Sequence, residues 1–134
     1  MRPHMTTPRL TRLPALSLLL LTACGFGADR GMSEAEAATL TGGSASRGPA
    51  LLRSYGCGSC HTIGGVTGAT ALVGPPLTSM GERSFIAGVL VNTPDNMVRW
   101  IRDPRGVDSL TAMPNLGVTD QDARDMAAYL YSIR

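Results

Sequence analysis

A cysteine pair followed directly by a histidine restricts the fold of this chain more than any other feature. The three residues are Cys57, Cys60 and His61, within the stretch "YGCGSCHTIGG" at residues 55–65. Thiols and an imidazole at this spacing bind a metal ion, exchange disulfides or fasten a prosthetic group, and each use demands different surroundings. The rest of the sequence therefore has to separate these chemistries.

The motif lies in a predicted all-helical domain over residues 47–134. One helix is expected to begin at Pro49, because proline suits the first position of a helix. A second helix is predicted between an N-cap at Thr93 and the Asp103–Pro104 step, which stops it. A third is predicted from an N-cap at Thr119 to the C-terminus, because apolar residues follow at helical spacing.

Glycine- and proline-rich stretches at 62–78 and 104–118 separate these helices, and strand signals are almost absent. A domain of 88 residues with three short helices and two long loops buries little apolar surface by itself. Small domains compensate with disulfides, a metal ion or a cofactor. We therefore expect the cysteine motif to supply what the core lacks.

The number of cysteines and histidines separates the chemistries. A structural zinc site needs four such ligands, whereas the chain has three cysteines, and His4 lies in a predicted signal. A thioredoxin-like redox pair belongs between a strand and a helix, and a plain disulfide leaves His61 unexplained. The pattern C-x-x-C-H is the attachment signature of a c-type haem, in which the thiols bond to the vinyl groups and the imidazole lies under the iron. We therefore predict one haem c attached through Cys57 and Cys60, with His61 as an iron ligand.

Residues 1–23 have the features of an export signal. An arginine-containing head, "MRPHMTTPRLTR", precedes the nine-residue apolar run "LPALSLLLL", which is too short to span a bilayer. The following "LTAC" resembles the lipobox of bacterial lipoproteins, which predicts cleavage before a lipidated Cys24. The alternative is an ordinary secretory signal with an incidental cysteine at this position.

The segment after the signal differs from both its neighbours in composition. Residues 24–46 are rich in Gly, Ala, Ser and Thr without a sustained apolar face, so we predict a flexible tether between Cys24 and the domain. From residue 24 onward nine arginines are balanced by ten acidic residues, and the chain has no lysine. A nucleic-acid surface needs a concentrated basic face, so no nucleic-acid partner is expected.

Four segments of the domain extend the motif: "CGSCHTI", "GPPLT", "NTPDNMVRWIRDP" and "TAMPNLGVTDQDARDMAAYL". Through them most of residues 47–134 resembles the class I c-type cytochromes, in particular the cytochrome c domain of haem-copper oxidase subunit II. The resemblance implies a small all-α fold of about three to five helices, with long loops wrapped around one covalently attached haem c. The N- and C-terminal helices of such a fold cross, and Gly48, Met126 and Tyr129 would lie near that crossing.

The resemblance also indicates how the iron is held. An iron that only carries electrons needs a sixth ligand, and methionine is the natural candidate because His4 is removed with the signal. Met80 and Met113 lie outside the predicted helices, and the family places its ligand in a Met-Pro setting, which points to Met113. The family's first Gly-Pro proline accepts a hydrogen bond from the ligand histidine, and this position maps to Pro75.

Three further residues are candidates for the haem surroundings. Trp100 is expected to pack against the haem or to bond a propionate through its indole N–H, with plain core packing as the alternative. Arg83 and Arg102 are candidates to neutralise buried propionates, although an exposed arginine is the commoner situation.

These features predict a one-electron carrier of a respiratory-type chain, without catalytic residues. The expected location is the periplasmic side of a bacterial membrane, where the lipid is the anchor; the inner membrane is favoured. Expected partners are redox proteins such as a terminal oxidase, a bc-type complex or a periplasmic dehydrogenase. The chain itself is expected to be a monomer or a subunit of a complex. The alternatives are a haem sensor or enzyme with a displaceable methionine, and a fixed subunit of an oxidase or dehydrogenase complex.

Overall fold

The computed structural model describes residues 32–134, so the predicted signal and Cys24 lie outside the described residues. Helices make up most of the regular structure in this part of the chain. The α-helices are α1 (Glu34–Thr41), α2 (Gly48–Ser54), α3 (Pro94–Arg102), α4 (Pro104–Val107) and α5 (Asp120–Ser132). The 3-10 turns are η1 (Ala45–Arg47), η2 (Cys57–Ser59) and η3 (Met80–Glu82). The strands β1 (Phe85–Ile86) and β2 (Leu90–Val91) pair in antiparallel fashion, with Phe85 opposite Val91.

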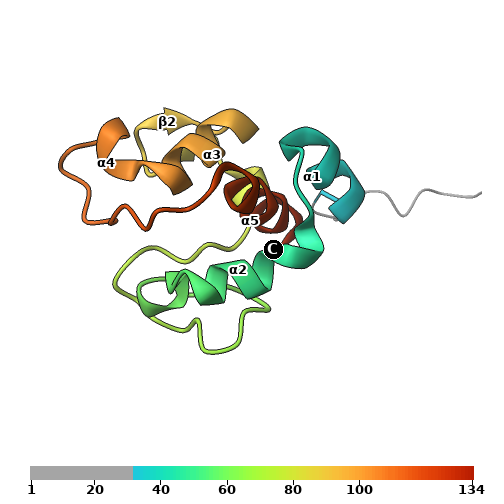
Figure 1. Ribbon diagram of the computed structural model, residues 1–134, viewed down its shortest axis with the longest axis horizontal. Coiled ribbons are helices and arrows are strands. Elements are labelled where there is room, and N and C mark those ends of the chain that lie inside the picture. Colours follow the sequence, from blue (N-terminus) through green and yellow to red (C-terminus); the bar gives the residue numbers. More distant parts are fainter. Residues whose placement is uncertain (1–31) are drawn as a thin grey trace, which may run out of the picture.

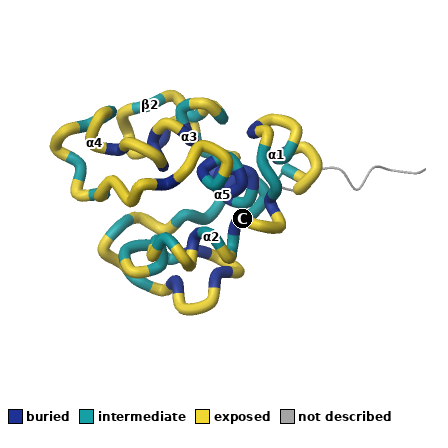
Figure 2. The backbone as a smooth tube through the Cα atoms, viewed as in Figure 1, coloured by how far each residue is buried: buried dark blue, intermediate teal, exposed yellow. Residues whose placement is uncertain are grey.

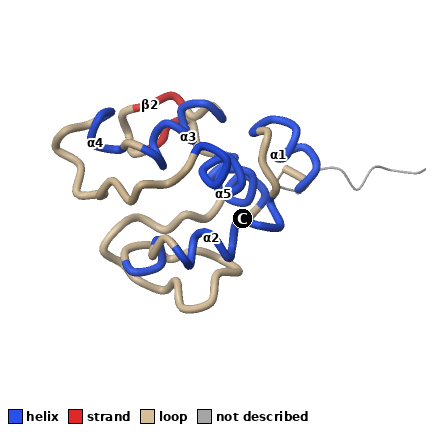
Figure 3. The backbone as a smooth tube through the Cα atoms, viewed as in Figure 1, coloured by secondary structure: helices blue, strands red, loops and turns tan. Residues whose placement is uncertain are grey.

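Helix α5 is the central element of the molecule, and α1, α2 and α3 pack against it (Figure 1). It begins where Thr119 Oγ1 accepts a hydrogen bond of 3.2 Å from the backbone N–H of Asp122. Most of its residues are buried, including Met126 and Leu130, and Figure 2 shows this concentration of buried chain. Long loops occupy the end of the molecule away from α1 (Figure 3). The predicted small all-α fold is confirmed for residues 32–134, where only β1 and β2 are strands.

The predicted crossing of the N- and C-terminal helices is present. Gly48, the first residue of α2, lies directly against Tyr129 of α5, and a Cβ atom at this position would overlap the Cβ atom of Tyr129. Close approach of the two helices therefore requires glycine here. The Tyr129 hydroxyl then donates a hydrogen bond of 2.6 Å to the carbonyl of Gly64, which ties the loop after the cysteine motif to α5.

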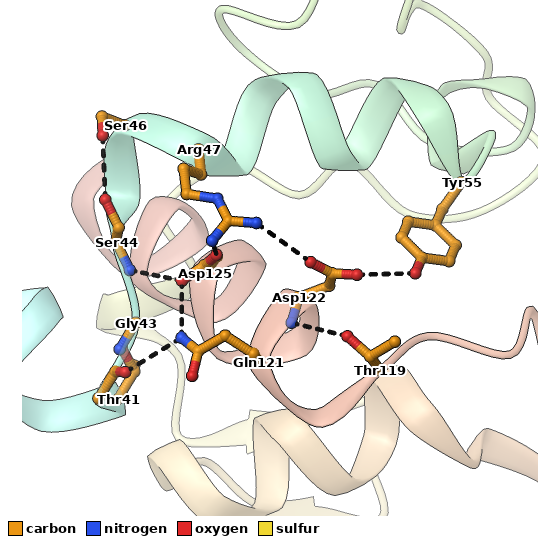
Figure 4. A network of polar contacts seen from close by, with 11 residues as sticks. Thr41, Gly43, Ser44, Ser46, Arg47, Tyr55, Thr119, Gln121, Asp122 and Asp125 are labelled. Carbon is orange, nitrogen blue, oxygen red and sulfur yellow. Dashed lines mark hydrogen bonds and ion pairs between the residues drawn. The ribbon is translucent and has the colours of Figure 1, made fainter.

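Two aspartates of α5 join the same crossing through a polar network (Figure 4). Asp122 Oδ2 accepts a hydrogen bond of 2.8 Å from the Tyr55 hydroxyl at the end of α2. Asp125 is buried; its Oδ1 accepts from the backbone N–H of Ser44 at 2.7 Å, and its Oδ2 lies 3.1 Å from Arg47 Nη1. Oδ2 accepts no hydrogen bond within the described chain, so the arginine supplies the charge that compensates its burial.

The predicted tether is wrong for residues 33–46, which are part of the fold. Helix α1 begins in a capping box: Glu36 N–H donates to Ser33 Oγ at 3.3 Å, and Ser33 N–H donates to Glu36 Oε2 at 2.8 Å. Ala37 and Thr41 are buried, and α1 packs against α5. This helix was not predicted from the sequence because its buried side chains are small and do not form an apolar stripe.

The three predicted helices are present as α2, α3 and α5. Thr93 caps α3 by accepting a hydrogen bond of 3.2 Å from Asn96 N–H, and the helix ends at Arg102 before Pro104. The same proline then begins the single turn α4, which Asp103 caps through a bond of 3.0 Å from Gly106 N–H. Within residues 32–134 no helix is long and apolar enough to cross a bilayer.

Candidate haem-binding site

The two cysteines and the histidine lie on one tight turn after α2. Gly56 allows this turn because its φ of 75° is in the left-handed region, where a side chain is strained. The backbone N–H of His61 then donates to the carbonyl of Cys57 at 3.0 Å, and that of Cys60 donates to the same carbonyl at 3.2 Å. Both sulfurs are free thiols on partly exposed residues. One rigid turn therefore presents two thiols and an imidazole together.

The imidazole of His61 is oriented by the loop that follows it. Its Nδ1 lies 2.7 Å from the carbonyl oxygen of Pro75, which only accepts, so Nδ1 carries the hydrogen and Nε2 keeps its lone pair. The loop passes closely over the turn, since Gly74 N–H donates to the Cys60 carbonyl at 2.7 Å. A Cβ atom at Gly74 would meet the His61 ring. The Pro75 contact agrees with the resemblance to the class I cytochromes, whereas the role of Gly74 was not expected from the sequence.

The turn and the loop after it contribute no acidic, lysine or arginine side chain. Residues 54–81 contain no Asp, Glu, Lys or Arg. Burial raises the pKa of the Cys57 thiol, which is therefore neutral at physiological pH. Such a low-polarity environment suits a large apolar ring better than an exposed metal ion.

Met113 is placed differently from the other methionines of the predicted domain. Met80, Met97 and Met126 are buried in the core, whereas Met113 is partly exposed in the loop between α4 and α5. Its backbone N–H donates to Thr111 Oγ1 at 3.2 Å. Met113 packs against the edge of the core, and it is the one methionine of this domain that is only partly buried. Figure 1 shows its loop and the loop after His61 at the same end of the molecule.

For Arg83 and Trp100 the sequence did not decide between a role at the haem and an ordinary place on the surface or in the core. The Arg83 guanidinium donates to the carbonyls of Pro76 at 2.7 Å and Thr78 at 2.9 Å, so it holds the loop that carries Pro75. Trp100 lies buried on α3 among core residues. The structure brings Pro75 and the Cys57–His61 turn together through hydrogen bonds; Arg83 joins them through the loop.

Asn92 is a positioning residue that was not expected from the sequence. Its Nδ2 donates to the carbonyls of Met80 at 2.7 Å and Arg83 at 2.8 Å, and its Oδ1 accepts from the Tyr131 hydroxyl at 2.6 Å. It thereby links the loop after Pro75 to helix α5. The sequence gives little indication of this role, because asparagine is common in turns and Asn92 stands directly before the N-cap Thr93.

These residues fit a covalently attached haem. Two free thiols share a turn with an imidazole whose Nε2 is available, and the partly exposed Met113 lies in a second loop. Among residues 32–134 no three Cys, His, Asp or Glu side chains gather in a cluster fit to hold a metal ion by themselves. The donor set is thus that of a haem iron rather than of a bare metal site.

Comparison with known families agrees with this geometry. The sequence profile described as cytochrome c matches residues 45–134. The chain belongs to the cytochrome c family. Its cofactor is accordingly haem c, with Cys57 and Cys60 at the attachment positions, and its role is haem-based electron transfer.

Three curated relatives of this cytochrome are named cytochrome c oxidase subunit 2. That of Alkalihalophilus pseudofirmus is 38% identical over 91 residues, covering 67% of this chain and 26% of the relative. That of Bacillus subtilis is 28% identical over 89 residues, with 65% and 25% covered. That of Bacillus sp. strain PS3 is 27% identical over 107 residues, with 77% and 30% covered. The chain therefore spans about a quarter to a third of the length of these relatives.

Proposed function

We propose that the protein is a monohaem one-electron carrier of a respiratory-type chain, held at the periplasmic side of a bacterial membrane by a lipid on Cys24. His61 and Met113 would be the two axial ligands of its iron. The observation that carries the proposal is the bond of 2.7 Å between His61 Nδ1 and the Pro75 carbonyl, on a turn with two free thiols. It leaves Nε2 free to bind iron.

Each residue then has a defined task. The haem, when bound, supplies one electron by cycling between Fe(II) and Fe(III). Cys57 and Cys60 hold the ring covalently, and the Pro75 carbonyl keeps the imidazole of His61 in one orientation. The soft thioether of Met113 favours the ferrous state and so raises the reduction potential relative to a second imidazole. The uncharged stretch 54–81 keeps the site in a medium of low polarity.

A matched pair of methionine variants tests the ligand assignment. Met113→Leu removes the thioether at nearly constant volume, and we expect loss of the long-wavelength methionine-to-iron band in the ferric spectrum and a fall in reduction potential. Met80→Leu makes the same change in the buried core, and the band is expected to stay. Loss of the band in the Met80 variant alone would show that the wrong methionine was chosen.

A second candidate function is that of a fixed subunit in an oxidase complex. It is supported by the relatives, which are named as oxidase subunits, and by the short connection to Cys24, because helix α1 is capped at Ser33 and packs against α5. The partners would then be the terminal oxidase or a bc-type complex rather than a distant dehydrogenase. Stoichiometric co-purification with one such complex in mild detergent distinguishes the fixed subunit from a mobile carrier.

A further inference from the structure

Three apolar side chains are far more exposed than any others among the described residues. Leu72 is 82% exposed, Val73 81% and Leu110 92%, whereas the next large hydrophobic residue, Val91, is 58% exposed. The first two lie in the loop after His61, and Leu110 lies three residues before Met113. Figures 1 and 2 show both loops, largely exposed, at the end of the molecule opposite α1. We call these three residues the apolar face.

The Leu72–Val73 pair is held outward by its neighbours on both sides. The carbonyl of Ala71 accepts a hydrogen bond of 3.0 Å from Thr62 Oγ1. The backbone N–H of Gly74 donates to the Cys60 carbonyl at 2.7 Å. Both anchors belong to the haem-attachment turn or its continuation, so the pair is fixed beside the haem site and cannot retreat into the core without breaking them.

Leu110 is presented in a similar way on the second loop. Its backbone N–H donates to Asp108 Oδ1 at 3.0 Å, and Thr111 N–H donates to the Asp108 carbonyl at 3.1 Å. This turn closes on itself and points the leucine away from the core. The neighbouring Met113 is the proposed iron ligand. The loop after His61 and the loop of Met113, the two residues that would hold the iron, therefore both display apolar side chains to solvent.

The charge around the apolar face is almost nil. Residues 54–81 carry no acidic or basic side chain apart from His61, and between Pro104 and Thr119 only Arg105 and Asp108 are charged. Opposed charges steer partners and set the salt dependence of association, and this surface offers few of them: Arg105 and Asp108 in one loop, and Arg83, which donates to the carbonyls of Pro76 and Thr78, beside the other. A matching partner face should therefore be mainly apolar, because an isolated charge would lose its hydration against the three exposed side chains.

We propose that Leu72, Val73 and Leu110 form the docking surface for the redox partner, and that the partner offers a mainly apolar protein face. This inference rests on the proposed electron-transfer function and names the chemistry of its partner. A membrane surface is the less suitable occupant, because the face has no cluster of arginines to bind anionic lipid headgroups.

Electron transfer to the host's own oxidase tests the docking surface. The reduced holoprotein is mixed with detergent-solubilised host membranes, and oxidation is followed by stopped-flow absorption. The double variant Leu72→Ser, Val73→Ser should lower kcat/KM about tenfold. The wild-type rate should change less than about twofold as salt rises from about 10 to about 300 mM.

The matched control makes the same two substitutions elsewhere. Leu40 on α1 is 54% exposed and Val89, between β1 and β2, is 51% exposed, and neither lies in a haem-site loop. The double variant Leu40→Ser, Val89→Ser should react with the membranes as the wild type does. Both double variants should reduce hexacyanoferrate(III) at the wild-type rate, because this small oxidant needs no apolar docking face.

Several results would overturn the inference. Equal rates for the two double variants, or a rate that falls steeply with salt, would exclude an apolar docking face. A changed ferric spectrum or reduction potential in the Leu72–Val73 variant would show that the pair lines the haem instead. Weaker binding of this variant to phospholipid vesicles, at an unchanged oxidase rate, would assign the face to lipid. A wild-type protein without a methionine-ligated haem spectrum would instead refute the proposed function itself.

Discussion

His61 shows how much a single backbone contact decides. The carbonyl of Pro75 sets which ring nitrogen carries the hydrogen, and Gly74 gives the ring room to lie beside the loop. Arg83 holds that loop from the other side by two hydrogen bonds to its carbonyls. The orientation of the imidazole is therefore a property of a loop of the chain, and the ring itself needs no further partner at Nδ1.

Gly74→Ala tests this packing. A methyl group at this position would overlap the His61 ring, so the ring or the loop must move, and we expect the free energy of unfolding to fall by about 2 kcal/mol. The ferric spectrum should change as well, because the imidazole is displaced. Urea unfolding and absorption spectroscopy measure the two effects.

Gly64→Ala is the matched control, because the nearest atom to its added methyl group is the Arg134 carbonyl oxygen at 3.9 Å, an ordinary contact. This variant should keep both the wild-type spectrum and a stability within about 0.5 kcal/mol. If Gly74→Ala behaves like the control, the close packing of His61 against the loop plays no part in holding the ring.

Some single residues were predictable from the sequence. Cys57, Cys60 and His61 follow from ligand counting, whereas Pro75 was expected only through the resemblance to the class I cytochromes. Gly74 and Asn92 were not, because their roles depend on which loop passes over which turn. No periodicity in residues 62–78 encodes that path.

At the scale of elements, α1 is the least expected part of the fold. It is held by a capping box at Ser33, by Gly42 in the left-handed region at its end, and by burial of Ala37 against α5. The alanine-rich composition that reads as a tether is also the composition that lets two helices approach closely. Composition alone does not separate these outcomes.

Two alanines of α1 test whether this helix belongs to the domain. Ala37 is 0% exposed, so Ala37→Asp would bury a charge without a partner and should lower the free energy of unfolding by about 3 kcal/mol. Ala35 is exposed, and Ala35→Asp adds a negative charge near the helix N-terminus, where it is tolerated. Denaturant unfolding followed by circular dichroism compares the two variants. Equal stability of the two variants would indicate that residues 33–46 are a tether and not part of the fold.

The helices that the sequence did predict share one property, which is a strong N-terminal signal. Thr93 and Thr119 both cap helices in the structure, and Pro49 lies in the first turn of α2. Helix α4 was not predicted because Pro104 was interpreted only as the end of the preceding helix, whereas it also begins the next one. The β1–β2 pair was not predicted because strands of two residues are too short to show an alternating pattern.

At the scale of the whole molecule, the polar network of Figure 4 connects the N-terminal segment to the C-terminal helix. The hydrogen bond from the Tyr55 hydroxyl, with help from Thr119 and the charge of Arg47, lowers the pKa of Asp122. Its folded pKa then lies below the unfolded value of about 3.9. The stabilisation is fully present above that unfolded value and is lost as pH falls through the folded pKa.

Tyr55→Phe should therefore move the acid limit of stability. Without the hydroxyl the pKa of Asp122 rises toward its ordinary value, so the holoprotein should lose stability at a higher pH than the wild type. Urea midpoints from pH 7 down to about pH 3 measure the shift. Tyr129→Phe is the matched control, since its hydroxyl donates to the Gly64 carbonyl and not to a carboxylate. That variant should lose stability equally at every pH, and an equal acid shift in both variants would contradict the assignment to Asp122.

The N-cap of α1 at Ser33 also limits how far the domain can lie from its proposed anchor. Eight residues, 25–32, separate Cys24 from Ser33, and a chain of this length reaches at most about 30 Å. Cys24→Ser should release the protein into the soluble fraction after cell disruption, because the lipid would be lost. Retention on the membrane in the Cys24→Ser variant would contradict lipidation.

A longer connection then tests whether a membrane partner lies within this reach. Inserting about 14 Gly and Ser residues after Gly31 should leave the protein on the membrane but lower its rate of oxidation there roughly fourfold, since effective concentration falls as about the −3/2 power of linker length. Oxidation by intact membranes, with hexacyanoferrate(III) as a control for the haem, measures the change. A rate that rises with the longer linker would place the partner beyond the reach of the native connection. It would then favour a carrier that meets its partner only at the limit of its tether.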